Sequence, residues 1–192
     1  MKKNLKKIIT FISASLICFS ANAQLKIPAA SPLQTVTQAF GLGEIKIEYG
    51  RPGVKNRVIF GELVPFGKPW RTGANASTKI TIDNDIKINN TDVAKGTYAL
   101  YTIPNTTEWE VILSKDLSIS ANVEDYKPAD EVLRFKVKPE ALCYKMETFT
   151  IQINNVTNTS CSIDLVWEKT KVSIPVSTMV DDKIMTQIDK EL

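Results

Sequence analysis

The sequence predicts an all-β protein, an antiparallel β-sandwich that is jelly-roll-like or partly barrel-like and ends in a short C-terminal α-helix. Short stretches of alternating apolar and polar residues recur along most of the chain, separated by Gly, Pro and Asn turns. No helical pattern alternates with these stretches, which argues against the βαβ units of a parallel sheet. The one amphipathic pattern with helical spacing lies at the C-terminal end.

The expected strands are recognised by their alternation and by the turns that bound them. Residues 44–49 (EIKIEY) place their apolar side chains on one face. Residues 79–82 and 85–88 alternate around Asn84, which predicts a tight hairpin. The remaining strands are expected at residues 97–103, 109–113, 131–138, 148–154, 162–167 and 171–176.

The C-terminal residues 177–192 carry the helical pattern. Val180, Ile184 and Ile188 lie four residues apart and form one apolar stripe, and Thr178 suits the N-cap position. We expect this helix to pack on the sandwich, and the alternative is that its apolar face meets a partner.

The first 23 residues have the composition of a secretory signal peptide. Four lysines precede an apolar stretch, and the Ala-Asn-Ala after it predicts cleavage behind Ala23. A lipid anchor on Cys18 is disfavoured because the bulky Ile17 precedes it. No other stretch approaches the ~20 apolar residues of a spanning helix. We therefore expect an exported protein, periplasmic or secreted, that is neither transmembrane nor a lipoprotein.

The rest of the chain is long enough for one domain with a real core. We expect an extended N-terminal segment at residues 24–33, the β-sandwich at 34–176 and the helix at 177–192.

Charge and composition exclude several function classes. Without the four lysines of the signal peptide, 20 basic residues stand against 21 acidic ones, so nothing favours nucleic acid as a partner. The chain has no histidine, which excludes Ser-His-Asp and Cys-His catalysis and histidine-based zinc sites. We expect no metal site and no cofactor.

Two cysteines remain after the signal peptide, Cys143 and Cys161. If residues 145–154 and 162–168 form a hairpin, Cys161 lies near Gln152, about 30 Å along the strand from Cys143 at ~3.3 Å per residue. A disulfide needs Cα atoms within about 7 Å. We therefore expect two unbridged thiols.

The segment of residues 50–78 concentrates basic, aromatic and turn-forming residues between two expected strands. Arginine grips carboxylates and phosphates bidentately, and an aromatic face beside arginine and asparagine also suits sugars. The candidate binding residues are Arg51, Arg57, Lys68, Trp70, Arg71 and Asn75. We expect no catalytic residue among them.

Each of these residues also has a purely structural interpretation. Arg51 or Arg71 can neutralise a buried acid such as Glu44, Glu48 or Glu62. Trp70 can be a core anchor whose indole N–H meets a carbonyl, and Asn75 can be a turn residue.

The central segment and three further runs resemble a known family. QAFGLGEIKIEYGRPGVKNR at residues 38–57, IFGELVPFGKPWRTGANAST at 59–78, AKGTYALYTIP at 94–104 and METFTI at 146–151 are similar to domain-of-unknown-function family 2911. These are uncharacterised secreted proteins, mainly of Bacteroidetes-type bacteria. The resemblance implies an exported domain and no particular activity.

The expected function is therefore non-catalytic binding of a small polar or anionic ligand, a glycan or another envelope component, at residues 51–75. One alternative is a histidine-free hydrolase that uses carboxylates such as Glu44, Glu48 and Glu62. The other is a structural or protein-interaction domain of the cell envelope, whose protein partner the sequence does not name.

Overall fold

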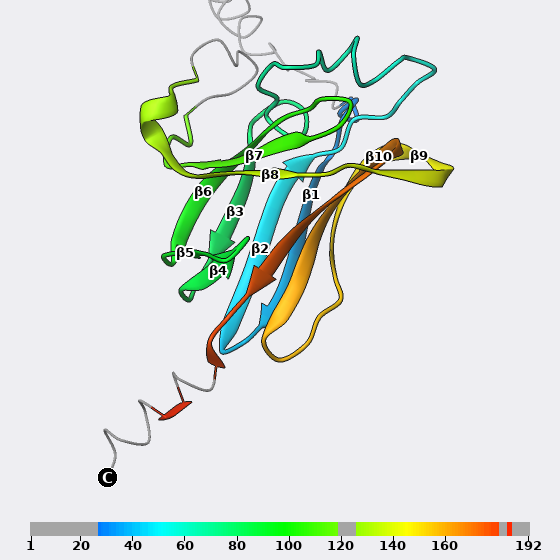
Figure 1. The fold of residues 1–192 in the computed structure, drawn as a ribbon. Helices are drawn as coiled ribbons and strands as arrows, with labels where there is room; N and C mark the ends of the chain where they lie inside the picture. Colours follow the sequence, from blue (N-terminus) through cyan, green and yellow to red (C-terminus); the bar gives the residue numbers. More distant parts are fainter. Residues whose placement is uncertain (1–26, 119–125, 181–183, 186–192) are drawn as a thin grey trace, which may run out of the picture.

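The computed structural model describes residues 27–118, 126–180 and 184–185. The expected signal peptide and most of the expected helix at 177–192 lie outside the described residues. Within them, two antiparallel sheets pack against each other without closing into a barrel, which confirms the predicted β-sandwich (Figure 1).

The two sheets differ in size. The larger has the order β1 (Leu33–Phe40), β2 (Gly43–Gly50), β3 (Thr78–Ile82), β6 (Gly96–Ile103), β7 (Trp109–Ser114) and β8 (Glu131–Val137). The smaller has the order β5 (Thr91–Val93), β4 (Ile86–Ile88), β10 (Ser160–Ser177) and β9 (Glu140–Asn154). A 3-10 turn, Pro128–Asp130, leads into β8.

Strand β10 folds back on itself near Glu168, whose φ is 53° (Figure 1). The backbone N–H of Thr178 donates to the carbonyl of Thr159 at 2.9 Å, which joins the two ends of β10. A straight strand of 18 residues would hold these ends about 60 Å apart. The strand therefore has two arms, which correspond to the separate strands predicted at 162–167 and 171–176. The first arm pairs with β9, and the second begins against the start of β9 and ends against β4.

The predicted hairpin around Asn84 is wrong. Strand β3 pairs with β2 and β6, whereas β4 pairs with β5 and β10, so the chain crosses from one sheet to the other at residues 83–85. Two carboxylates hold the crossing. Asp83 accepts the backbone N–H of Glu44 at 2.7 Å, and Asp85 accepts that of Lys95 at 2.8 Å.

Strand β1 was not expected from the sequence. Every second residue of this strand is exposed and the others are mostly half-buried, so its apolar alternation is weak. Its pairing along all of β2 is set by the two-residue turn Gly41–Leu42, in which Gly41 takes a φ of 61°. The sandwich therefore begins at Leu33, one residue before the expected boundary.

The core lies between the sheets and becomes aromatic at one end. Isoleucine and valine side chains from both sheets fill most of it. An aromatic cluster lies at the end that carries the β2–β3 segment; its members are Phe60, Trp70, Trp109, Phe149 and Trp167. Across the two sheets, the hydroxyl of Tyr49 accepts the backbone N–H of Ile151 at 2.8 Å.

Both described cysteines are free, as predicted; Cys143 is exposed and Cys161 is buried. The expected register was off by three residues, because Gln152 pairs with Asp164 rather than with Cys161. Among the described residues, no helix is long and apolar enough to cross a membrane.

Candidate functional site

The irregular segment between β2 and β3, residues 51–77, closes one end of the sandwich and is tied to both sheets. On one side, Val54 donates its N–H to the carbonyl of Glu147 at 2.8 Å at the β9 strand. On the other, Trp70 and Thr102 of β6 exchange backbone hydrogen bonds of 2.7 and 2.9 Å. The segment is therefore held like an element of the fold, although it forms no regular strand.

Close approach and left-handed backbone shape this segment. A Cβ on Gly50 would lie 2.2 Å from the carbonyl oxygen of Ala74, so only glycine fits there. Lys55, Thr72 and Asn75 have φ values of 48°, 52° and 66°, which non-glycine residues adopt at a cost. Strained backbone of this kind concentrates at functional sites, and this segment lines a cavity.

The Trp70 side chain belongs to the core rather than to an exposed platform. It is 7% exposed, and it stacks on Trp167 with ring centroids 5.7 Å apart and planes at 18°. Phe149 meets it edge-on at 5.1 Å, and its indole N–H donates to the carbonyl of Gly73 at 3.1 Å. The structure thus agrees with the core-anchor interpretation of this residue.

Arg51 and Lys68 lie apart from the other candidate residues. The Arg51 guanidinium donates to the carbonyl of Phe149 at 3.2 Å and to the hydroxyl of Thr150 at 2.9 Å. It therefore fastens the segment to β9, and the sequence-based pairing with Glu44, Glu48 or Glu62 is not its role. Lys68 is exposed and does not line the cavity described next.

The other four candidates surround one cavity of about 350 Å³. Arg57, Arg71 and Asn75 line it, and Trp70 and Trp167 form part of its apolar wall. Lys55, which sequence reasoning missed, also lines it. The cavity thus has three cationic side chains around it and, among the described residues, no carboxylate in its lining.

Local contacts fix the side chain of Arg57. Arg57 donates its Nε to the carbonyl of Val54 at 3.1 Å and its Nη2 to the carbonyl of Gly53 at 2.6 Å. These bonds use two of the five N–H donors of the guanidinium. Arg71 is half-buried, and desolvation lowers the pKa of its guanidinium from the usual value.

Asn75 combines the predicted turn role with a place at the cavity. Its side-chain amide donates to the carbonyl of Ser31 at 3.1 Å, and this bond holds the chain that precedes β1 against the segment. Ser31 also lines the cavity. The N-terminal segment therefore forms part of the same wall.

The carboxylates considered for hydrolysis do not meet at this cavity. Glu48 lies 3.2 Å from the ammonium of Lys46 and borders a different hollow, beside Lys79 and Tyr49. Glu44 and Glu62 line neither. In the described part of the chain, no group of three Cys, Asp or Glu side chains is placed to hold a metal ion.

The fold and this site define a β-sandwich domain with a cationic cavity at one end. The family model described as "Protein of unknown function (DUF2911)" matches residues 31–176, so the chain belongs to that family. No curated protein and no solved structure matches the chain.

Proposed function

We propose that this protein is an exported, non-catalytic domain that binds a small anionic ligand in the cavity lined by Lys55, Arg57 and Arg71. The observation that carries the proposal is the charge of that cavity: three cationic side chains line it without a carboxylate among the described lining residues. Export is inferred from the signal-like composition of residues 1–23.

The residues that line the cavity and its volume limit the classes of ligand that can bind there. Arginine guanidinium groups match the geometry of carboxylates and phosphates, and they are less strongly hydrated than an ammonium group. A cavity of about 350 Å³ is at the small end of ligand pockets, so the ligand has the size of one sugar or a short organic acid. A sugar phosphate or a sugar acid of the cell envelope fits both requirements.

The test is a thermal-shift titration of the protein without its first 23 residues against inorganic phosphate, citrate, glucose 6-phosphate and glucuronate. A ligand at 100 times its dissociation constant adds about 2.7 kcal/mol, which raises the melting temperature by roughly 5–10 °C for a domain of this size. Arg57→Ala and Arg71→Ala should each abolish the shift.

Lys68→Ala is the matched control. It removes one positive charge from the same segment, but its side chain does not line the cavity, so the shift should persist. If no anion shifts the wild-type protein, or if Lys68→Ala weakens the shift as much as Arg71→Ala does, the proposed site is wrong.

A further inference from the structure

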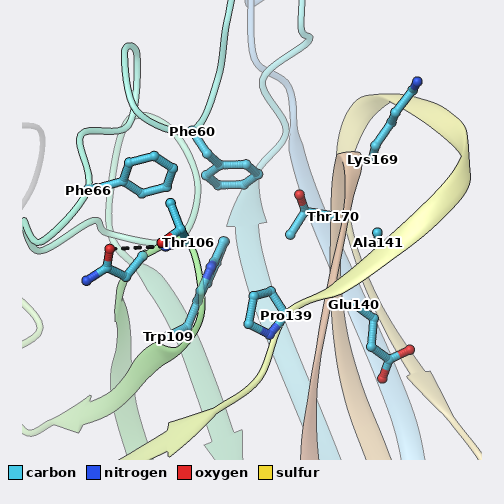
Figure 2. A pocket seen from close by; sticks show the side chains of 10 residues that line it. Phe60, Phe66, Thr106, Trp109, Pro139, Glu140, Ala141, Lys169 and Thr170 are labelled. Carbon is cyan, nitrogen blue, oxygen red and sulfur yellow. Dashed lines mark hydrogen bonds between the residues drawn. The ribbon is translucent and has the colours of Figure 1, made fainter.

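A second cavity lies at the same end of the sandwich, on the other side of the aromatic cluster. It has a volume of about 320 Å³ and opens between the β2–β3 segment, the β8–β9 junction and the fold of β10 (Figure 2). Phe60, Phe66 and Trp109 form one wall, and Pro139, Ala141 and Thr170 face them.

The aromatic wall combines one partly exposed ring with two packed ones. Phe66 is 39% exposed, although a large apolar ring gains from burial. It lies against Gly61, where an added Cβ would come within 2.9 Å of the Phe66 ring and where φ is 98°. Phe60 packs edge-on against Trp109, with ring centroids 4.8 Å apart. The ring of Phe66 is therefore partly exposed to solvent beside the packed rings of Phe60 and Trp109.

The rim of this cavity is polar with nearly balanced charge. Asn105 and Thr106 lie beside the aromatic wall, and the Asn105 side-chain oxygen accepts the Thr106 backbone N–H at 3.0 Å. That bond fixes the amide and leaves its two N–H donors available. Lys169 brings one positive charge, and Glu140 brings a negative one that lies 3.0 Å from the ammonium of Lys171.

This lining differs in kind from that of the cationic cavity, where the stacked Trp70 and Trp167 offer no bare ring. A purely apolar ligand would desolvate Asn105 and Thr106 without giving them partners. A small anion would find no cationic group in the space between the two walls, because the ammonium of Lys169 points away from it (Figure 2). A neutral ring with one apolar face and hydroxyl groups around its edge can pack against the aromatic wall and hydrogen-bond to Asn105 and Thr106 at the rim.

We propose that this second cavity is a binding site for a neutral sugar ring, which lies against Phe66 and hydrogen-bonds to Asn105 and Thr106. The site is separate from the anion site, and either can fail without the other. The β2–β3 segment thus contributes its exposed aromatic ring to the sugar site and its cationic side chains to the anion site.

The experiment follows backbone and side-chain amide signals by ¹H–¹⁵N NMR during titration with glucose, galactose and N-acetylglucosamine, and separately with phenol. We expect at least one sugar to shift the signals of Asn105, Thr106 and Lys169. Phe66→Ala should weaken that binding by at least about tenfold, because the ring's apolar contact is lost. Phe66→Tyr keeps the ring and should restore binding.

Val58→Ala serves as the control, because Val58 is 53% exposed on the same segment and lines neither cavity. This variant should leave the sugar titration unchanged. Failure of all three sugars would overturn the proposal. So would sugar shifts that survive Phe66→Ala, or phenol producing the shifts while no sugar does.

Discussion

Replacing Trp70 by alanine tests whether the β2–β3 segment is part of the core. Its indole is 7% exposed and touches three aromatic rings, with centroid distances of 5.7 Å to Trp167, 5.1 Å to Phe149 and 6.2 Å to Phe60. Truncation leaves a large void and frees the carbonyl of Gly73, which accepts the indole N–H. Truncating a buried tryptophan to alanine costs about 3–5 kcal/mol.

The assay is urea unfolding followed by far-UV circular dichroism. For a domain of this size, a loss of 3–5 kcal/mol lowers the melting temperature by roughly 6–20 °C and moves the urea midpoint without changing the slope. Trp70→Phe keeps an aromatic ring and loses the hydrogen bond, so it should cost clearly less than Trp70→Ala.

The matched comparison is Phe66→Ala, which removes an exposed ring from the same segment. We expect it to cost less than about 1 kcal/mol, as surface substitutions usually do. If Trp70→Ala were no more destabilising than Phe66→Ala, the segment would not be packed as described, and Trp70 would be free to act as a ligand platform.

Three further predictions follow from single contacts. Gly50→Ala should destabilise the fold by about 1–3 kcal/mol in the same urea assay, because its Cβ would lie 2.2 Å from the carbonyl oxygen of Ala74; an unchanged midpoint would contradict that close approach. In the folded protein without residues 1–23, iodoacetamide at about pH 8 should label the exposed Cys143 and spare Cys161, because burial raises the pKa of the Cys161 thiol to about 11; mass spectrometry would show a second adduct only in urea. Burial also raises the pKa of Tyr49, so above about pH 10 the unfolded chain loses a proton that the fold retains, and the free energy of unfolding should fall as pH rises; Tyr49→Phe should flatten that fall, and equal slopes for both proteins would refute the assignment.

The fold class was predictable because it depends on local alternation. The stretches 97–103, 109–113 and 131–138 became β6, β7 and β8 with boundaries shifted by at most one residue. Alternation does not say which strands pair, however. The hairpin expected at Asn84 is a crossing between sheets, and the carboxylates of Asp83 and Asp85 that hold it act through partners distant in the chain.

The sequence predicted which segment carries the candidate site, but not which of its side chains line the cavity. One cavity is indeed lined by Arg57, Arg71 and Asn75. Glycine and proline residues near them in the sequence favour the bends of the chain that bring them together. The sequence around Arg51 is equally rich in glycine and proline, yet the Arg51 guanidinium binds β9 and does not line the cavity. Nothing in the local sequence distinguishes these two outcomes, since each depends on which strand the guanidinium meets.

By itself, the sequence determined the alternation that makes a β-sandwich, the position of the irregular segment at residues 51–77 and the family to which the chain belongs. Only the tertiary structure decided that Trp70 is buried while Phe66 is partly bare, and that Lys169 and Thr106 share a cavity. The reason is physical. Strand periodicity is a property of neighbours in the chain, whereas burial and cavity lining depend on the surfaces that the two sheets bring together.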